Sequence, residues 1–430
     1  MSGEFKKTVS MLALLAAAGI MVGGVAPKAA GAADLGGDCC ADLEERVAEL
    51  EATAVKKGNK KVSVTITGRA NMNVMWWAEN GVAASNATYD HTSDIYFGNV
   101  ARNETEFNIK GEGKVNSDVT VGFLMEIYVD PSATGGTKNS QTKHQDAVNA
   151  VPQTTYVFIN SKAVGELRLG NQYQAMHETF NADTGKDTIG RYGQTRGAFT
   201  FLLRDTANTL TSIEYSKVLR PLEDARAQSL MYISPTMAGL TLRADVAGDD
   251  VYGASLTYDN KFKDDTIGVK ASLGYEKLSR VDIASALGTG LVASTDSQEI
   301  LAVSGSISES TSGLYVTGLW GKATASIAGR QDATNWWVKG GWQKNVTGIG
   351  NTMIYAGYLK EDGLYQNATS KSSSTLIEVG IDQGIDDVGS VYLQYQRGSL
   401  DNTLTGVGSG NGTINAQSLD QVIGGMIVKF

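Results

Sequence analysis

The chain has 430 residues, of which 42% are hydrophobic and 8% aromatic, and its formal net charge is −9. This acidic balance excludes nucleic acid as a partner of the chain as a whole. No internal segment approaches about 18 consecutive apolar residues, so helical membrane spans are excluded as well. The 50 glycines, against only 5 prolines, favour a curved, closed sheet over a helical fold.

The first 32 residues have the features of a secretory signal peptide. Lys6 and Lys7 precede an apolar run over residues 11–25, and small residues at 30–32 precede the expected cut. An uncleaved N-terminal anchor is the alternative interpretation. Removal of residues 1–32 leaves 34 basic and 45 acidic residues, and thus a net charge of −11 for the exported chain.

Residues 33–61 are predicted to form a periplasmic lead-in with a short coiled-coil helix. Four apolar residues recur at spacings of four, three and four, the pattern of an a/d seam: Leu43, Val47, Leu50 and Ala54. A helix this short is marginal on its own in water. It either bundles beneath a trimer of barrels or tethers the protein to the cell wall, and both interpretations stay open.

Cys39 and Cys40 are adjacent, and export favours their oxidation. A disulfide between sequence neighbours has poor geometry, so cross-links between subunits and an unpaired state are the two alternatives. Asp38 argues against lipid attachment at these cysteines. Two cysteines without a nearby histidine are too few ligands for zinc.

Residues 62–77 are the clearest predicted strand, because they have one apolar and one polar face. Alternation places one set of residues towards lipid: Val62, Val64, Ile66, Ala70, Met72, Val74 and Trp76. The other set points towards water: Ser63, Thr65, Thr67, Arg69, Asn71 and Asn73. About a dozen alternating residues ending in paired tryptophans are typical of a tilted membrane strand with an aromatic girdle. A soluble exported β-sandwich is a weaker alternative.

From this strand onward the sequence predicts an all-β fold: a transmembrane, antiparallel, up-and-down β-barrel of about sixteen strands. A loop through about Gly98 follows the first strand. Residues 118–130 form the clearest later strand, with Phe123 and Met125 outward and Glu126 and Tyr128 inward. The other strands are expected near residues 106–114, 154–160, 166–172, 228–234, 240–246, 251–259 and 266–276, on both sides of the turns 309–313, 346–351 and 383–389, and at 419–430.

Closure of this sheet follows from its hydrogen bonds. Each unpaired backbone group that faces hydrocarbon costs several kcal/mol, so the last strand must pair with the first. With about sixteen strands, side chains no longer fill the interior, and an aqueous channel is expected.

The last predicted strand ends on Phe430. Val422, Gly424, Met426 and Val428 alternate before it, which resembles the C-terminal signature of bacterial outer-membrane proteins. The resemblance implies recognition of Phe430 by the outer-membrane assembly machinery and an integral outer-membrane location.

Two segments on either side of residues 173–224, an interval without strand pattern, resemble the alphaproteobacterial porins. TTYVFINSKAVGELRLGNQYQ carries the family's G-x-x-R-L-G phrase, and SLMYISPTMAGLTLRADV carries its Y-x-S-P-T-x-A-G turn. DCCADLEERVAELEA is similar to the periplasmic lead-in of some members. The resemblance implies a trimeric, sixteen-stranded general-diffusion porin whose third loop, here residues 173–224, folds into the lumen. The sequence lacks the Pro-Glu-Phe-Gly-Gly phrase that many porins carry on this loop.

A pore selects solutes by its width and by the charges at its narrowest ring. We expect four wall arginines to face inward, since an arginine facing lipid at the midplane costs roughly 2–4 kcal/mol: Arg69, Arg102, Arg168 and Arg243. The third loop adds candidates for the constriction: Glu178, Asp183, Asp187, Arg191, Arg196 and Arg204. Acidic loop residues opposite basic wall residues would create a transverse electric field across the pore. The arginines of the loop could instead favour the passage of anions. In a third interpretation these loop residues are solvated surface and do not line the constriction, since charged loop residues commonly are.

No enzymatic activity, cofactor or metal site is predicted. Residues 140–143 match S-x-x-K without its companion motifs, and the glycine-rich residues 406–412 lack the flanking strand and helix of a phosphate cradle. The three histidines fall in different predicted loops: His91, His144 and His177.

The leading prediction is therefore passive diffusion of small hydrophilic solutes and ions across the outer membrane, through a homotrimer in contact with outer-membrane lipid. A substrate-selective channel on the same barrel is the first alternative. A structural protein that links the outer membrane to the cell wall through residues 33–61 is the second.

Overall fold

The structure is a computed structural model of the chain. It describes residues 61–80, 92–98, 105–130, 149–185, 201–219, 222, 226–248, 250–278, 297–326, 331–366, 370–407 and 412–430. All of these residues belong to one compact unit, Lys60–Phe430. The predicted signal peptide, the lead-in helix, Cys39 and Cys40 lie outside the described residues.

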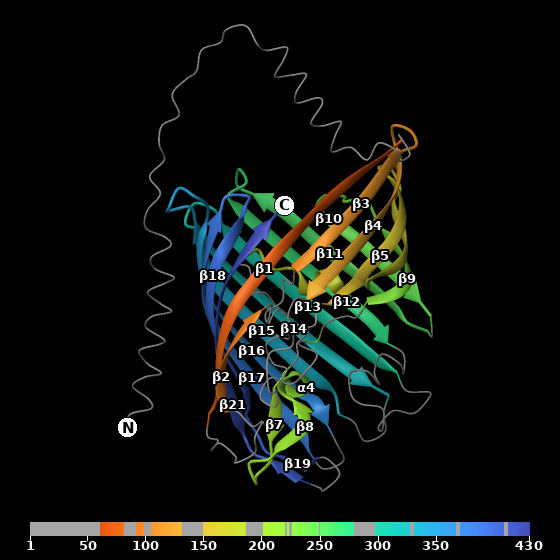
Figure 1. Ribbon diagram of the computed structural model, residues 1–430. Coiled ribbons are helices and arrows are strands. Elements are labelled where there is room, and N and C mark those ends of the chain that lie inside the picture. The colour runs from red at the N-terminus through yellow and green to blue at the C-terminus, as the bar shows by residue number, and fades with distance from the viewer. Residues whose placement is uncertain are drawn as a thin grey trace. The chain divides into compact units, whose positions relative to one another are not determined.

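Long antiparallel strands make up almost all of the described secondary structure (Figure 1). The barrel strands are β1 (Val62–Asn80), β2 (Ser93–Gly98), β3 (Thr105–Lys114), β4 (Val119–Asp130), β5 (Asn149–Ser161), β6 (Gly165–Tyr173), β9 (Arg226–Ile233), β10 (Leu240–Ala247), β11 (Tyr252–Phe262), β12 (Ile267–Leu278), β13 (Gln298–Glu309), β14 (Leu314–Ala325), β15 (Ala333–Lys344), β16 (Thr352–Gln366), β17 (Lys371–Ile385), β18 (Gly389–Leu400) and β21 (Gln417–Lys429).

Short elements lie in two of the connections between these strands. Between β6 and β9 are α3 (His177–Phe180), β7 (Leu202–Arg204), β8 (Leu210–Glu214) and α4 (Tyr215–Val218), and between β18 and β21 are β19 (Leu404–Val407) and β20 (Gly412–Ile414). Neither described helix is long and apolar enough to cross a membrane.

The barrel strands close into a ring of sixteen strand positions. Consecutive strands pair antiparallel from β3 to β6, from β6 to β9, onward to β18, and from β18 to β21. β2 and β3 pair with successive parts of β1, so together they occupy one of the sixteen strand positions of the ring. Residues 93–98 are therefore strand, where a loop through about Gly98 was predicted. β21 pairs with β1 from Arg69 to Asn80, which confirms the predicted closed, sixteen-stranded barrel.

The two faces of β1 meet different surroundings, as predicted. Val64, Ile66 and Met72 are more than half exposed on the outside of the barrel, whereas Asn71 and Asn73 are buried on the inside. The same alternation places apolar side chains outside along the later strands: Leu273, Leu301, Val316, Val338, Ile354 and Ile377 are all at least 40% exposed. An apolar exterior is what a barrel surrounded by lipid requires.

Part of the barrel interior is apolar and packed, which alternation along single strands did not predict. Trp77 lies on the inner face of β1, is fully buried, and has its ring centroid 4.7 Å from that of Phe201. Only Trp76 of the predicted tryptophan pair is thus left for an aromatic girdle. The same buried cluster includes three apolar residues of the interior segment: Leu203, Ile213 and Leu219. It also includes one inner-face leucine from each of β16, β17, β18 and β21: Leu359, Leu376, Leu400 and Leu419.

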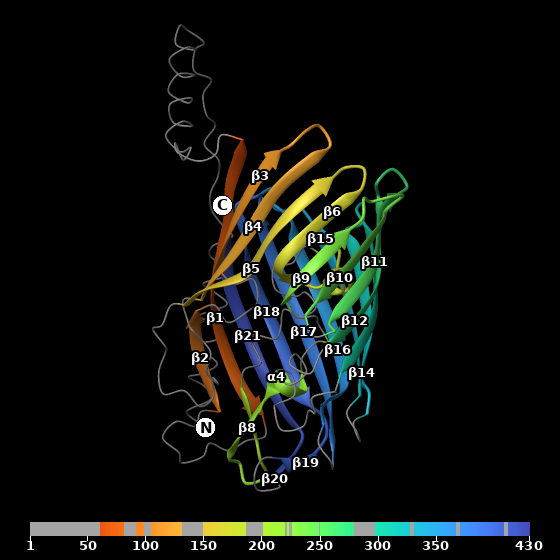
Figure 2. The ribbon, with the colours of Figure 1, turned by 90° about the vertical axis from the view of Figure 1, so that its right-hand side faces the viewer.

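The helix α4 lies in this apolar part of the interior. It contacts β16, β17 and β18, and both ribbon views show it within the outline of the strands (Figure 1 and Figure 2). Tyr215, at its start, is fully buried. The described part of the interval between β6 and β9 therefore contains short regular elements that pack as a small core.

The two ends of the barrel differ in their connections. At one end, which we call the short-turn end, few residues join consecutive strands: 115–118, 162–164, 234–239, 263–266, 310–313, 345–351 and 386–388. The other end, the long-loop end, has the longer intervals, among them residues 81–92, 131–148 and 279–297, and two short connections at 248–251 and 367–370. Transmembrane barrels have short periplasmic turns and longer extracellular loops, so the short-turn end, where β1 begins and β21 ends, is the periplasmic one.

Candidate functional site: the interior of the barrel

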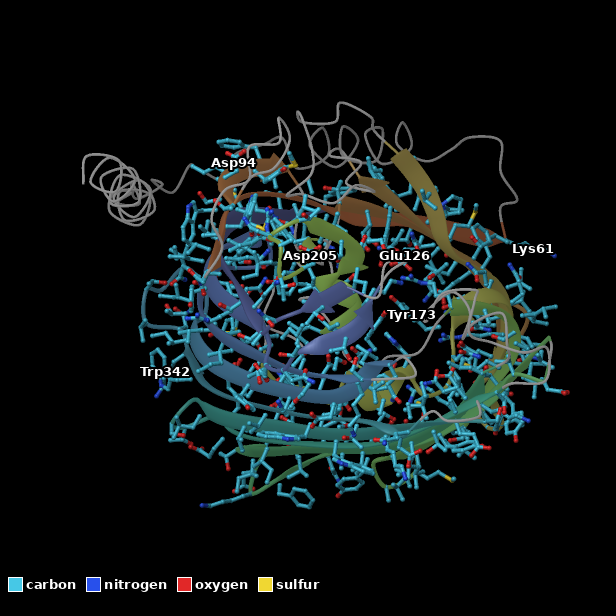
Figure 3. The ribbon with its side chains drawn as sticks, turned by 90° about the horizontal axis from the view of Figure 1, so that it is seen from below. Lys61, Asp94, Glu126, Tyr173, Asp205 and Trp342 are labelled. Carbon is cyan, nitrogen blue, oxygen red and sulfur yellow. The ribbon has the colours of Figure 1, made fainter. Side chains whose placement is uncertain are left out.

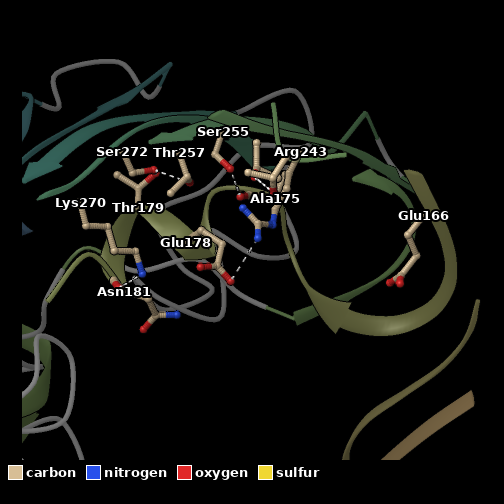
Figure 4. Close-up of polar contacts among 12 residues, drawn as sticks. Glu166, Ala175, Glu178, Thr179, Asn181, Arg243, Ser255, Thr257, Lys270 and Ser272 are labelled. Atoms are coloured by element: carbon tan, nitrogen blue, oxygen red, sulfur yellow. Dashed lines mark hydrogen bonds and ion pairs between the residues drawn. The ribbon is translucent and has the colours of Figure 1, made fainter. Parts of the chain in front are cut away.

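Residues 174–185 run along the inner face of strands β10 to β14, and their first contacts are with β10 and β11 (Figure 4). The backbone N–H of Ala175 donates to Asp245 Oδ1 at 2.8 Å, and Ser255 Oγ donates to the carbonyl of Ala175 at 2.5 Å. Asp245 and Ser255 are both buried. The barrel wall thus satisfies both backbone groups of Ala175, which fixes the point where the segment meets the wall.

The helix α3 continues this segment across β12. Thr179 Oγ1 lies 3.1 Å from Ser272 Oγ, and Lys270 Nζ donates to the carbonyl of Asn181 at 2.6 Å. Gly274 makes the close approach possible, because a Cβ there would lie 2.4 Å from Thr179 Oγ1. A small inner face on β12 is therefore what lets α3 lie flat against the wall.

A buried ion pair holds the end of this segment to β15. Lys339 Nζ lies 2.5 Å from Asp183 Oδ2, and Thr317 Oγ1 donates to Asp183 Oδ1 at 2.9 Å. The Lys339 side chain is fully buried, and its Nζ is within 5.1–5.8 Å of three ring centroids, those of Tyr315, Trp337 and Tyr355. A lysine buried among rings needs a counter-ion, so the charge of Asp183 is tied to the wall.

A second buried ion pair joins residues 201–206 to the first and last strands. Arg204 Nε donates to Glu79 Oε2 at 2.7 Å, and neither side chain is more than 1% exposed. The Gln417 side chain bonds both the N–H and the carbonyl of Arg204. Because Glu79 lies on β1 and Gln417 on β21, Arg204 spans the line where the barrel closes.

The residues at which the chain leaves β6 and enters β9 contact one another. Tyr173 pairs with Arg226, and the Arg226 guanidinium lies 3.9 Å from the Tyr173 ring centroid. Arg226 also donates to Tyr128 OH at 3.0 Å and to Gln153 Oε1 at 2.9 Å. The His177 ring stacks on the Tyr173 ring, with ring centroids 3.7 Å apart. Both ends of the interval are thus attached to β4 and β5.

Partly exposed charges occupy the inner face of β1, β3, β4 and β6. Arg69 on β1 pairs with Glu106 on β3 at 2.9 Å, and Arg168 pairs with Glu166 within β6; the two arginine side chains are 26% and 28% exposed. Lys110 is also exposed on this face. Glu126 projects into the ring of strands in the view from below, whereas Trp342 lies outside it (Figure 3).

One more pair connects the interior segment to the wall. Arg243 Nη2 on β10 lies 4.0 Å from Glu178 Oε1 on α3, and the side chains are 21% and 33% exposed. These two residues lie at the boundary between the loop and the wall in Figure 4. At this distance and exposure the pair leaves both charges available to solvent.

Charged residues on the inner face of β15, β16 and β17 are in contrast almost completely buried. Lys339, Glu361, Glu378 and Asp382 are each at most 2% exposed. β16 and β17 lie behind residues that pack into the interior, as their contacts with α4 show, and β15 is covered by Asp183, the partner of Lys339. The exposed charges on the inner face of β1, β3, β4, β6 and β10 thus contrast with the buried charges of β15, β16 and β17.

The predicted site residues divide into three groups. Arg69, Arg168 and Arg243 lie on the inner face and, with Glu178, are partly exposed. Asp183 and Arg204 are buried in ion pairs, so in this arrangement they anchor the loop and offer little surface to a solute. Outside the described residues are Arg102, Asp187, Arg191 and Arg196.

The sequence interpretation missed several partners of these residues. Glu166 stands two positions from Arg168, and alternation alone would have placed it on the same face. The inward direction of Glu106 and Lys339 follows from alternation in the same way. Their pairing with Arg69 and Asp183 depends on contacts between residues distant in sequence. In the described ranges no group of three or more His, Cys, Asp or Glu side chains could hold a metal ion.

A closed barrel of sixteen strand positions, apolar outside and lined with charged and polar groups inside, defines a transmembrane channel protein. In sequence, residues 13–403 match the Gram-negative porin family. The chain therefore belongs to this family: it is an integral outer-membrane protein and forms a diffusion channel. No curated protein matches the chain in sequence.

Solved porin structures share the fold at low sequence identity. The anion-selective porin from Comamonas acidovorans is 16% identical, with a TM-score of 0.56 over 86% of this chain and 100% of that one. The trimer form of OmpT, an outer membrane protein of Vibrio cholerae, is 13% identical, with a TM-score of 0.52 over 86% and 100%. Salmonella typhi OmpF in complex with daunomycin is 13% identical, with a TM-score of 0.51 over 87% and 99%.

Proposed function

We propose that solutes cross this channel along the inner face of β1, β3, β4, β6 and β10, with residues 173–224 as the constriction domain opposite. The observation that carries this proposal is the uneven exposure of charge. Arg69, Arg168 and Arg243 are 21–28% exposed on these strands, whereas the inner-face charges of β15 to β17 are at most 2% exposed. Permeating ions interact with solvated charges at the pore wall, so this side is the permeation path.

We further propose a trimeric general-diffusion porin of the alphaproteobacterial type. The resemblance of the segments around residues 173–224 supports the subfamily, and the trimer form of OmpT, which shares the fold, supports the oligomer. Reconstitution of the full chain in a planar bilayer tests the proposal. Openings in steps of three indicate a trimeric channel, single steps contradict the trimer, and absence of conductance from folded protein contradicts the channel.

We expect weak ion selectivity, because the described path has balanced charges. Its basic residues are Arg69, Lys110, Lys114, Arg168 and Arg243, and its acidic residues are Glu106, Glu112, Glu126, Glu166 and Glu178. A tenfold salt gradient should therefore give a reversal potential near zero. A substrate-selective channel would instead show conductance that one solute class blocks at low concentration.

Removing one sign of charge from the path should produce selectivity. Glu106→Gln with Glu166→Gln leaves Arg69 and Arg168 without their carboxylate partners, so the reversal potential should shift towards that of chloride. Arg69→Gln with Arg168→Gln should shift it towards that of potassium. The control variant Asp264→Asn with Asp265→Asn removes two negative charges from a short turn and should leave the reversal potential unchanged. An equal shift of the reversal potential in this control would argue against the proposed permeation path.

The structural alternative for residues 33–61 calls for a separate test. Deletion of this segment should leave conductance intact and should abolish cell-wall attachment only if the segment is a tether. Retention of cell-wall attachment after the deletion would remove the tether hypothesis and leave the diffusion channel untouched.

Phe430 is the proposed assembly signal. Its backbone N–H donates to the Gly68 carbonyl at 3.0 Å and its carbonyl accepts from Gly68 N at 2.9 Å, while its ring lies 5.6 Å from that of Phe107. We expect Phe430→Ala to reduce the yield of folded barrel in the membrane, since it removes a large apolar group where β21 closes on β1. Heat-modifiable gel mobility of membrane fractions measures the yield, and Lys429→Ala is the neighbouring control.

A further inference from the structure

A repeated pair of residues occurs on the outer face of four strands that run in the same direction. An aromatic residue is followed two positions later by a cation, on β12, β14, β16 and β18 in turn: Tyr275 and Lys277, Trp320 and Lys322, Tyr358 and Lys360, Tyr395 and Arg397. We call the four cations the outer cation row. A spacing of two keeps each aromatic residue and its cation on one face of the strand.

The strand pairing shows that this face is the outer one. Inner-face residues Thr317, Leu319 and Gly321 alternate with Trp320 and Lys322 on β14. Trp320 and Tyr395 are 41% and 37% exposed, and Trp336 on β15, whose ring centroid is 4.9 Å from that of Tyr358, is 45% exposed. The aromatic members therefore face outward on this side of the barrel, and Trp336 and Tyr358 are in contact.

The four cations lie at similar distances along their strands, since each is eight to ten residues from the first residue of its strand at the short-turn end. From the short-turn end, the outward positions of β14 run Leu314, Val316, Gly318, Trp320 and Lys322, so the cation is eight residues above the first. Eight steps span roughly 27 Å along a strand, or about 20 Å along the barrel axis at the usual tilt. The apolar band of such barrels is flanked by aromatic girdles at the two interfaces. Each cation is one outward position beyond an aromatic residue, so the cations lie where the apolar band ends and the lipid headgroups begin.

The cations have donors that no protein acceptor uses. Lys322 Nζ contacts Asp332 at 2.6 Å and Arg397 contacts Asp420 at 3.7 Å, and these cations are 41% and 43% exposed. Lys277 lies 5.7 Å from the Tyr252 ring and hydrogen-bonds to no acceptor in the described part of the chain. Each ammonium group carries three donors and each guanidinium five, so every member of the row has donors left for a ligand.

Other strands of the same direction lack this arrangement. The described outward residues of β10 are Leu240, Leu242, Ala244 and Val246, and those of β4 include Met125 and Ile127. Neither set contains an aromatic–cation pair near the long-loop end. The row therefore marks one side of the barrel, from β12 to β18.

We propose that the outer cation row binds phosphate groups of lipid headgroups in the leaflet at the long-loop end. Phosphate oxygens accept charge-assisted hydrogen bonds from lysine and arginine, and each basic residue near an anionic lipid surface adds to the electrostatic attraction. The neighbouring carboxylates of Asp332, Asp401 and Asp420 hold the cations in place. The lipid binds through the remaining donors, while the aromatic residues below contact its acyl chains.

The test uses the full folded chain in neutral detergent with added lipid. The probes are lipid A with two phosphates, the same lipid after removal of both phosphates, and inorganic phosphate alone. Native mass spectrometry counts the bound lipid molecules. A change in the fluorescence of Trp320 and Trp336 reports binding. One variant removes the row: K277Q, K322Q, K360Q and R397Q. Its control removes the same charge at the short-turn end: K114Q, K162Q, K263Q and K344Q.

We expect the phosphorylated lipid to bind the native chain and the control alike, and to bind the row variant at least about tenfold more weakly. Equal binding by the row variant, equal loss in the control, or equal binding of the dephosphorylated lipid would overturn the proposal. Competition by inorganic phosphate at the lipid's own concentration would assign the row to free anions and also overturn it. Gel mobility before and after heating checks that both variants are folded, and unchanged conductance of the row variant separates this site from the pore.

Discussion

Arg204→Met is expected to lower the free energy of unfolding by about 3–5 kcal/mol, the usual cost of removing one partner of a buried ion pair. The Arg204 guanidinium lies 2.7 Å from Glu79, and both side chains are at most 1% exposed. The variant keeps much of the buried volume but leaves the Glu79 carboxylate without this cation. Urea unfolding followed by tryptophan fluorescence measures the change, and Trp77, fully buried against Phe201, lies in the affected region.

The double variant Arg204→Met with Glu79→Leu should recover most of this loss, because replacing both partners of a buried pair by apolar groups is often neutral or stabilising. Lys110→Met is the control. The pair of Lys110 with Glu112 has side chains 49% and 43% exposed, so its loss should change stability by less than about 1 kcal/mol. If Arg204→Met lowers the free energy of unfolding no more than Lys110→Met does, the buried pair does not hold the loop to β1.

Lys339→Met is expected to raise the single-channel conductance and to add transitions between conductance levels. The substitution leaves Asp183 buried without the ammonium group 2.5 Å away, a cost of about 3–5 kcal/mol if the loop stays docked. A cost of 3 kcal/mol shifts the ratio of docked to released loop by more than about a hundredfold. The loop then leaves the wall and reaches solvent, where the Asp183 charge is hydrated.

Two variants separate this effect from general damage. Asp183→Asn with Lys339→Met leaves no buried charge in the pair, so conductance should return towards the native value. Thr317→Val removes one hydrogen bond to Asp183 and one shared with Ser306, each worth about 1 kcal/mol. It keeps the Lys339 charge beside Asp183 and should leave the conductance levels close to native. Planar-bilayer recordings measure all three variants, and native conductance of Lys339→Met would contradict the anchoring role of the pair.

The barrel itself could be predicted from the sequence because its signal is local. A strand alternates with a period of two, so each stretch such as residues 62–77 reports its own lipid-facing and lumen-facing sides. The number of such stretches and of the turns between them predicted about sixteen strands, and the need to satisfy backbone hydrogen bonds required closure. The strand at residues 93–98 escaped prediction because it is short and shares a position with β3.

The interior could be predicted only in part. The inward direction of Arg69, Arg168 and Arg243 follows from alternation and from the cost of placing arginine in lipid. Their carboxylate partners could have been found by the same argument, at least for Glu166. The burial of Asp183 and Arg204 could not, because a charged residue in a loop has no periodic neighbour to show whether it meets solvent or the wall.

The sequence by itself determined that this chain is a closed membrane barrel with a terminal strand that pairs with the first, since strand faces and backbone satisfaction are set residue by residue. Only the tertiary structure decided which part of the lumen carries solvated charge and which part is packed. That division arises from side-chain contacts between residues far apart in the chain, such as Glu79 with Arg204 and Asp183 with Lys339. No local pattern encodes such contacts, because they exist only after the interior segment has met the wall.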